Sequence, residues 1–400
     1  MDEIAIKYVK NIIYNEGKMY MISHLMTGVM VYDFNTKKVE KLCDYPQGAK
    51  DINAFEIMLV YGTKLYLFPC GIDSIYCYDL ERQQYTELVS LHSITKSIPE
   101  RLFFEAVVHD ELIYAVCRSP HLIICINPMD DNVQVWEVDQ EIPISDKIVH
   151  VDFSVCVYGN TLLYPYSSDM MIEFNTDDKK YKIVHLIREE EGYDEKYRCL
   201  LKMTMNDTGK QWVYDWYGSV YEIVSNKMVK INMPPELEGL YDDGMYTGNT
   251  QITGVLFNKD RLYFLLNSDK RILVYDTQTN GFTWIDNILT SWKPLERKDA
   301  YITYTHMQGN TYLLYDLNDG NIHVLDLETG FGDTIEMCML TEDITKDNDL
   351  WEYWKSSIFR QEDLRSYMKY IWKISDTEIK SENSYCGEKI YCALMKEFKE

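Results

Sequence analysis

Residues 271–286 read RILVYDTQTNGFTWID, and recognisable copies of this stretch recur along almost the whole chain. Side chains alternate with a period of two from Ile272 to Asp276, turn-forming residues follow from Thr277 to Gly281, and a second run begins at Phe282. Strict alternation is typical of β-strands, and a short Gly- and Asn-containing segment between two such runs is typical of a hairpin. The stretch therefore predicts an antiparallel β-hairpin.

Six further copies align with this stretch on its Tyr-Asp step. The aligned residues follow one another at intervals of 46 to 52 residues and are Asp33, Asp79, Asn127, Asn175, Val224, Asp276 and Asp326. Each copy is preceded by a second alternating unit, such as residues 254–266, so every period holds four short strands. Four-stranded units with two apolar faces must stack on one another, and a period of about 50 residues is typical of propeller blades. Residues 1–340 therefore predict an all-β fold, a seven-bladed β-propeller of four-stranded blades.

The repeated pattern also resembles that of a known family. A hydrophobic pair, Tyr-Asp, a Thr-containing turn and a following aromatic residue resemble the Kelch repeat, and Thr279 and Trp284 fit it best. The resemblance covers roughly residues 4–340, and the paired glycines usual at the end of the Kelch second strand are absent from every copy. It implies a Kelch-like propeller.

Two segments decide how such a ring closes. Residues 4–14 are expected to form the innermost strand of the first blade, and residues 333–339 the outer strand of the last. Each blade would then be complete without exchanging a strand between the chain ends. Alternatively, Asp2 to Tyr8 lie on the seventh blade as an outer strand, which would protect its edge by a swapped strand.

The repeat stops at Thr341, and the remaining sequence has helical spacing. Ile390, Leu394 and Phe398 recur at intervals of four, with Tyr391 and Met395 beside them, which gives one apolar stripe. Residues 341–400 therefore predict a small helical appendage. It either folds onto the flank of the propeller or serves as a docking helix for a partner.

Composition limits the partners and the compartment. Asp and Glu number 64 against 40 Lys and Arg, and the formal net charge of -24 opposes binding to nucleic acid and to anionic membranes. The sequence has no apolar run of 18 residues and no secretory signal at its start, so we expect a cytoplasmic protein. Cys77, Cys117, Cys125 and Cys156 lie in apolar strand runs, where reduced thiols pack as small hydrophobes.

No motif for a metal or a cofactor is present. The chain lacks C-x-x-C, H-E-x-x-H and G-x-S-x-G, and its eight histidines are scattered singly. We therefore predict no cofactor. A lone histidine such as His306 is expected to be a satisfied structural residue.

Carboxylates on the predicted inner strands provide the one candidate for catalysis. Glu56, Glu105 and Asp152, with Lys10 and Lys202, are expected near the entrance of the central channel. A pair of carboxylates there would suit acid/base catalysis by a glycan-acting hydrolase or lyase. The alternative, which we favour, is that the same residues are the solvated lining of the channel.

A second set of candidates lies at one mouth of the ring. The blade-to-blade connections are long, and those at 187–199, 233–251 and 286–300 are rich in carboxylates and aromatics. Together with the ends of the second strands they provide the predicted ligand-binding residues, which are His24, Arg118, Tyr166, Trp216, Tyr246, Asn267, Trp292 and Tyr315. Aromatic and hydrogen-bonding side chains on one face suit a protein, peptide or carbohydrate ligand. We therefore predict a non-enzymatic binding or scaffolding propeller that recognises its ligand at the long-loop mouth.

Overall fold

The computed structural model describes the strands of the repeat region and the short turns between them. The described residues are 3–5, 9–23, 28–46, 54–70, 72–93, 103–117, 121–138, 154–166, 169–188, 200–206, 208–215, 219–234, 252–266, 271–285, 302–316 and 320–340. The chain divides into two compact units, Met1–Ile144 with Asp152–Asp343 and Ser145–Val151 with Ile344–Glu400. The predicted helical appendage, residues 341–400, lies outside the described residues. None of the described helices is long and apolar enough to cross a membrane.

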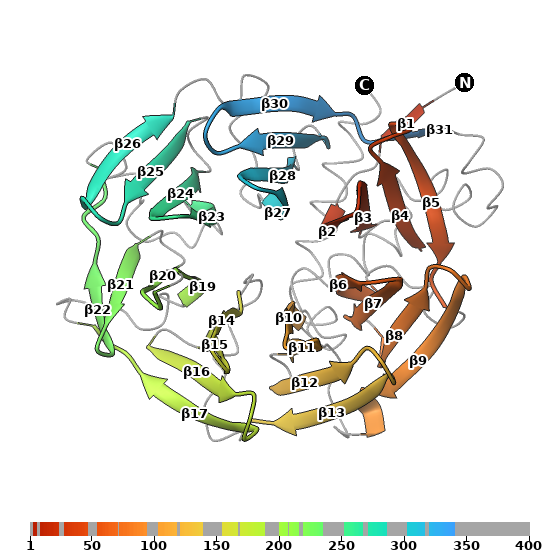
Figure 1. Ribbon diagram of the computed structural model, residues 1–400, viewed down its shortest axis with the longest axis horizontal. Coiled ribbons are helices and arrows are strands. Elements are labelled where there is room, and N and C mark those ends of the chain that lie inside the picture. Colours follow the sequence, from red (N-terminus) through yellow and green to blue (C-terminus); the bar gives the residue numbers. More distant parts are fainter. Residues whose placement is uncertain are drawn as a thin grey trace, which may run out of the picture. The chain divides into compact units, whose positions relative to one another are not determined.

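The first unit is a β-propeller of seven blades arranged in a ring (Figure 1). Each blade has an antiparallel sheet of four strands that follow one another in the sequence, with the first strand nearest the centre. The predicted all-β, seven-bladed fold is therefore confirmed.

The strands of the first three blades have these bounds. Blade one has β2 (Val9–Asn15), β3 (Lys18–Ser23), β4 (Gly28–Asp33) and β5 (Lys38–Asp44). Blade two has β6 (Phe55–Tyr61), β7 (Lys64–Pro69), β8 (Ser74–Asp79) and β9 (Gln84–Ser90), and a 3-10 turn η1 (Leu91–Ser93) follows. Blade three has β10 (Phe103–His109), β11 (Leu112–Cys117), β12 (Leu122–Asn127) and β13 (Asn132–Glu137).

The remaining blades continue in the same order. Blade four has β14 (Cys156–Tyr158), β15 (Thr161–Pro165), β16 (Met170–Asn175) and β17 (Lys180–His185). Blade five has β19 (Leu200–Met205), β20 (Gln211–Asp215), β21 (Val220–Val224) and β22 (Lys227–Lys230). Blade six has β23 (Ile252–Asn258), β24 (Arg261–Leu266), β25 (Ile272–Asp276) and β26 (Gly281–Ile285). Blade seven has β27 (Ile302–Gln308), β28 (Thr311–Asp316), β29 (Ile322–Asp326) and β30 (Gly330–Ile335).

The repeated Asp or Asn is explained by the turn that follows the third strand of a blade. Asp276 Oδ1 accepts hydrogen bonds from the backbone N–H groups of Gln278 at 3.0 Å and Thr279 at 2.9 Å. A short polar side chain that mimics a backbone turn in this way fixes the hairpin locally. The same role is filled in other blades by Asp33, Asp79, Asn127, Asn175 and Asp326.

The two hairpins of a blade are also joined to each other at this end. The backbone N–H of Thr277 donates to the carbonyl of Asp260 at 2.9 Å, and the Thr277 hydroxyl donates to the same oxygen at 2.8 Å. The backbone part of this contact recurs from Phe34 to Gly17 and from Leu80 to Thr63. The two turns at this end of each of these blades are therefore joined to each other.

The hydrophobic core consists of side chains packed between neighbouring blades. One cluster joins blades two and three through residues such as Tyr66, Ile113 and Ile124, and another joins blades three and four through Tyr114 and Tyr164. These tyrosines are almost fully buried. The abundance of tyrosine in this sequence therefore serves, at these positions, the packing of one blade on the next.

The ends of the ring differ in detail from the sequence prediction. The predicted inner strand over residues 4–14 is not continuous, because β2 begins at Val9 and Glu3–Ala5 forms a separate strand, β1. β1 pairs antiparallel with β31 (Cys338–Leu340), which follows the complete outer strand β30. Blades one and seven each contain four consecutive strands, so no strand is exchanged within a blade, as predicted. The chain ends form an additional two-stranded sheet instead.

Blade five has a strand that the sequence prediction assigned to a long loop. Residues 187 and 188 form β18 (Ile187–Arg188), which runs parallel to β22 and extends the sheet to five strands. The guanidinium of Arg188 is buried, lies 3.3 Å from the Asp215 carboxylate and 4.7 Å from the centre of the Tyr221 ring. This buried ion pair holds β18 against the blade.

Candidate functional site

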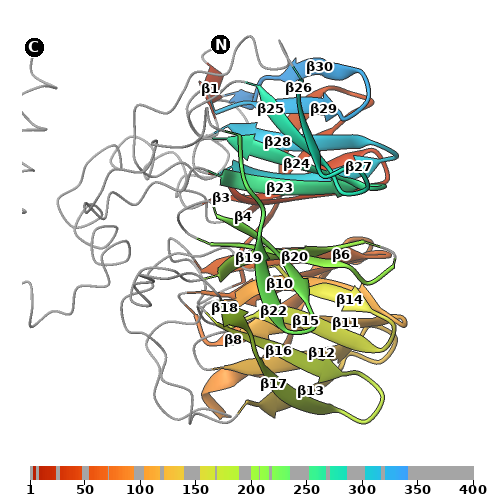
Figure 2. The same ribbon diagram turned by 90° about the vertical axis from the view of Figure 1, so that its left-hand side faces the viewer.

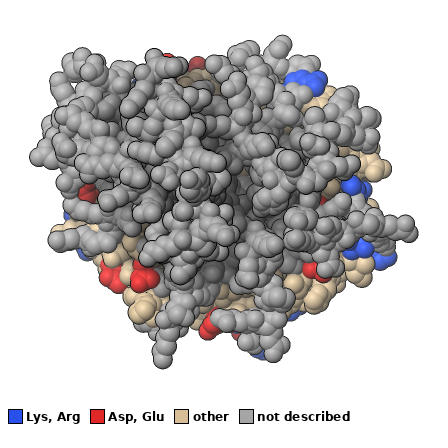
Figure 3. Space-filling view, turned by 180° about the vertical axis from the view of Figure 1, so that it is seen from behind, with Lys and Arg blue, Asp and Glu red and all other residues tan. Residues whose placement is uncertain are grey.

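Most of the predicted ligand-binding mouth lies outside the described residues. This applies to His24, Arg118, Trp216, Tyr246, Asn267 and Trp292, to the candidate catalytic residue Asp152, and to the loop residues beyond Arg188, Pro234 and Ile285. Seen from behind the view of Figure 1, the described acidic and basic side chains appear around the rim of the ring (Figure 3). The role of this mouth therefore stays a prediction.

Two of the predicted ligand-binding residues, Tyr166 and Tyr315, are described, and both are buried. Their exposed fractions are 9% and 1%. The Tyr166 ring stacks on His121, with 4.6 Å between ring centres and 14° between planes, while His121 Nε2 lies 2.9 Å from the Tyr164 hydroxyl. These contacts join blades three and four, so Tyr166 contributes to the packing between them.

The two described candidate carboxylates contact neighbouring blades. Glu56 on β6 forms an ion pair with Lys10 on β2, and both side chains are largely buried. Glu105 on β10 accepts a hydrogen bond from the backbone N–H of Val155 in blade four, with 2.5 Å between the two atoms. Each carboxylate is thus held by the adjacent blade. These contacts favour a structural role over the predicted acid/base role.

The contact made by Glu105 recurs around the inner ring. Asn11 Oδ1 accepts from the Met58 N–H at 3.2 Å, and the Ser154 hydroxyl accepts from the Met203 N–H at 2.8 Å. In each case the acceptor and the donor lie about one repeat apart, in adjacent blades. The sequence predicts Glu105 on an inner strand, whereas Asn11 and Ser154 are not among the predicted site residues. The sequence does not show that these side chains point toward the next blade rather than the channel.

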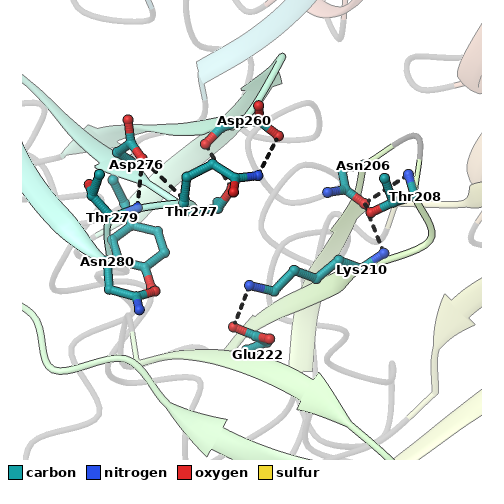
Figure 4. Close-up of polar contacts among 11 residues, drawn as sticks. Asn206, Thr208, Lys210, Glu222, Asp260, Asp276, Thr277, Thr279 and Asn280 are labelled. Atoms are coloured by element: carbon teal, nitrogen blue, oxygen red, sulfur yellow. Dashed lines mark hydrogen bonds and ion pairs between the residues drawn. The ribbon is translucent and has the colours of Figure 1, made fainter.

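The junction of blades five and six carries a group of polar side chains on the turn face (Figure 4). Lys210 Nζ lies 3.0 Å from Glu222 and 5.3 Å from the centre of the Trp212 ring. The hydroxyl of Tyr275, in blade six, donates to Asn280 Oδ1 at 2.8 Å. Burial raises the pKa of Tyr275, and the negative charges of Glu222 and Asp276 add to the effect. This tyrosine therefore stays protonated and acts as a hydrogen-bond donor.

The cysteines whose side chains the structure describes, from Cys43 to Cys156, are free thiols, and most of them are buried. Cys77, Cys117 and Cys125 are at most 5% exposed, as predicted, whereas Cys156 is only partly buried. Burial raises the pKa of the Cys77 thiol to about 11. Thiols of this kind are protonated at neutral pH, so they pack as small apolar groups. In the part of the chain that the structure describes, no cluster of three or more His, Cys, Asp or Glu is arranged to hold a metal ion.

The comparison with known proteins places the fold. No family model and no curated protein matches this chain. A chain from the complex of KlAtg21 with the coiled coil of AgAtg16 matches with a TM-score of 0.53 and 12% identity, over 84% of this chain and 100% of that one. The β-propeller domain of Cps50 (Swd1) from Myceliophteria thermophila matches with a TM-score of 0.50 and 11% identity, over 81% and 97%. At these identities the likeness shows the fold alone, and the chain is a seven-bladed β-propeller, a fold that commonly serves as a protein-binding scaffold.

Proposed function

We propose that this chain is a non-enzymatic scaffold that binds a protein partner. The observation that supports this function best is the state of Glu56 and Glu105, the two described carboxylates of the inner strands. Both are held by neighbouring blades, one by Lys10 and one by the Val155 amide. A general acid or base needs an oxygen directed at the substrate, and these contacts direct one oxygen of each carboxylate at the protein instead.

Propellers commonly bind protein partners, and one of the similar structures is that of a complex with a coiled coil. We propose that this chain binds a protein or peptide rather than a carbohydrate, at the long-loop mouth that the sequence predicts to carry Trp216, Tyr246 and Trp292. The acidity of the whole chain, with a formal net charge of -24, favours a basic segment there and opposes nucleic acid and membrane surfaces. A cytoplasmic location and a Kelch-like origin of the repeats belong to the same proposal.

The test uses the full chain as bait and a purified captured protein as ligand. Replacing Trp216, Tyr246 and Trp292 together by Ala is expected to weaken the measured affinity by at least about tenfold, with the circular dichroism spectrum unchanged. Affinity for a basic segment is expected to fall as salt is added, whereas affinity for a sugar responds little. Unchanged affinity in the triple variant would exclude this face.

A screen of glycan substrates tests the enzymatic alternative. Turnover by the wild-type chain that disappears in Glu105→Gln would support the hydrolase or lyase and contradict the scaffold. Because Gln can still accept the Val155 hydrogen bond, this substitution separates catalysis from folding.

A further inference from the structure

Asn280 and Gly281 form the one Asn-Gly step in the sequence of 400 residues. They lie in the hairpin turn between β25 and β26 of blade six, at the end of the ring that carries the short hairpin turns (Figure 2). In such a step the backbone nitrogen of the second residue can approach the side-chain amide of the first, because glycine has no side chain to obstruct it. The step is therefore a candidate site of covalent change.

The turn is open to water. Asn280 is exposed, as are its neighbours Gln278 and Thr279. The backbone of Asn280 has a φ of 56°, in the left-handed region that Asn tolerates better than most residues. Gly281 is the first residue of β26, the outermost strand of the blade, and pairs with Asp276 at the end of the ladder. The end of an outer strand opens locally at a small cost in free energy, so the Gly281 nitrogen can reach other positions.

The side-chain amide of Asn280 is held by a hydroxyl group. The Tyr275 hydroxyl donates to Asn280 Oδ1 at 2.8 Å, and the Tyr275 ring is 4% exposed and packs on Phe282 with 4.9 Å between ring centres. Figure 4 shows Asn280 at this turn, next to Asp276. A donor at Oδ1 draws electron density from the amide carbonyl, and it stabilises the negative charge that develops on this oxygen when Cγ is attacked. The hydrogen bond therefore activates the amide for nucleophilic attack.

The reaction that this arrangement favours needs water as its only co-reactant. The Gly281 nitrogen loses its proton to base in the solvent and attacks Cγ of Asn280, so that a new C–N bond closes a succinimide ring. The C–N bond of the side-chain amide breaks, and ammonia leaves after taking a proton from the solvent. Water then adds to one of the two ring carbonyls and opens the ring. The product has an aspartate or an isoaspartate at residue 280, and no step involves oxidation or reduction.

Asn226 of blade five provides a comparison within the same molecule. It is exposed and has a φ of 65°, close to that of Asn280, but it is followed by Lys227. The two asparagines therefore share exposure and backbone conformation and differ in the residue that supplies the nucleophilic nitrogen. A difference in their conversion isolates the effect of the glycine.

The fold of blade six does not require a glycine at residue 281. Its φ lies outside the left-handed region, and an added methyl group would meet Thr279 Oγ1 at 3.3 Å, which a small shift of that side chain relieves. The equivalent turns of other blades have a positive φ at the position of Asn280 and no glycine after it, at Lys37, Gln83, Asp131 and Lys179. Gly281→Ala is thus expected to leave the turn intact.

Conversion would alter the contact between the two hairpins of the blade. Thr277 joins them by donating to the Asp260 carbonyl, and Thr279 N–H donates to Asp276 Oδ1 in the same turn. An isoaspartate adds a carbon atom to the backbone ahead of Gly281, which disturbs its pairing with Asp276. An aspartate adds a negative charge beside the Asp276 carboxylate, and like charges repel at this distance. Either product is expected to lower the stability of the turn.

We propose that the Asn280–Gly281 step is a site of spontaneous deamidation, and that the Tyr275 hydroxyl assists the reaction by donating to the amide oxygen. The modification adds one negative charge to the turn between β25 and β26. It needs no enzyme and no partner, so the inference is independent of the proposed scaffold function.

The test incubates the purified full chain at neutral and at mildly alkaline pH and follows residues 226 and 280 by mass spectrometry of proteolytic peptides. Asn280 is expected to convert, faster at the alkaline pH, while Asn226 stays an amide. Gly281→Ala is expected to slow the conversion of Asn280 to the level of Asn226, with an unchanged circular dichroism spectrum. Tyr275→Phe keeps the ring and removes the donor, and it is expected to slow the conversion by about two- to tenfold, the effect of one neutral hydrogen bond.

The consequence for stability is measured on the same samples. Incubation is expected to lower the melting temperature of the wild type and to leave that of Gly281→Ala unchanged. Conversion of Asn280 no faster than that of Asn226, or equally fast in Gly281→Ala, would overturn the site. An equal or faster conversion in Tyr275→Phe would overturn the assistance by the hydroxyl, because the hydrogen bond would then be neutral or would restrain the amide.

Discussion

Glu105 of blade three accepts a hydrogen bond of 2.5 Å from the backbone N–H of Val155 in blade four. Val155 is buried, so removing the acceptor leaves its amide without this bond in the core. We expect Glu105→Ala to lower the free energy of unfolding by about 1–3 kcal/mol, and Glu105→Gln to stay close to wild type, since an amide oxygen also accepts. Urea titration measures both, with Glu111→Ala at an exposed position as control. Equal stabilities of the Ala and Gln variants would contradict the structural role.

The capping aspartates predict how stability depends on pH. Hydrogen bonds from backbone N–H groups lower the pKa of Asp33, Asp79, Asp276 and Asp326 below the usual 3.8. A lowered pKa in the folded state contributes stability above the unfolded pKa, and this stability is lost as pH falls through the folded pKa. We expect Asp276→Asn to keep the turn, as Asn127 and Asn175 do in their blades, and to reduce the loss of stability below about pH 4.

Thermal unfolding at pH 7 and at pH 3 measures this difference. Asp276→Ala is the paired variant, since it removes the acceptor altogether and is expected to lower the melting temperature at both pH values. If the melting temperature of Asp276→Asn fell between pH 7 and pH 3 by as much as that of the wild type, the Asp276 carboxylate would not contribute to the acid sensitivity.

The Arg188–Asp215 pair predicts a large effect from one substitution. Both side chains are at most 5% exposed, and Asp215 Oδ1 also accepts from the Ser219 N–H at 2.9 Å. Arg188→Met leaves a buried carboxylate without its ion-pair partner, so we expect a loss of about 3–5 kcal/mol in the free energy of unfolding. Lys182→Met, which breaks the exposed pair with Glu173, is the control and is expected to cost at most about 1 kcal/mol. Similar losses of unfolding free energy in the two variants would contradict the role of the buried Arg188–Asp215 pair as an anchor of β18.

Gly254 predicts a steric coupling between blades six and seven. A methyl group at this residue would lie 2.9 Å from Cε1 of Tyr304 and 3.1 Å from Cδ1 of Leu265. The Tyr304 hydroxyl donates to the Val255 carbonyl at 3.3 Å, so the ring cannot move away without breaking this contact. We expect Gly254→Ala to cost about 1–3 kcal/mol in the wild type and much less in a Tyr304→Ala background. A double-mutant cycle measures the coupling, and additive losses would show that the ring adapts.

Much of the site could not be predicted from the sequence because strand alternation does not say which blade a side chain faces. The spacing of Glu56 and Glu105 identified them as inner-strand residues, yet whether an inner-strand carboxylate points at the channel or at the adjacent blade depends on the packing of two blades. The same holds for Tyr166, because its burial and its stacking on His121 depend on the packing of blades three and four. Tyr315 is likewise buried, and for the predicted ligand-binding residues outside the described ranges the prediction stands as it was made.

The sequence by itself determined the number of blades, the four strands of each and the Asp-capped turns, because these depend on a period of about 50 residues and on side chains that bond to their own turn. Whether the chain ends exchange a strand was left open by the sequence, and the tertiary structure showed that each blade is built from consecutive strands. Only the tertiary structure decided that β1 pairs with β31 and that β18 joins blade five. Such contacts join residues far apart in the chain, and their free energy depends on the register of strands that the local sequence does not specify.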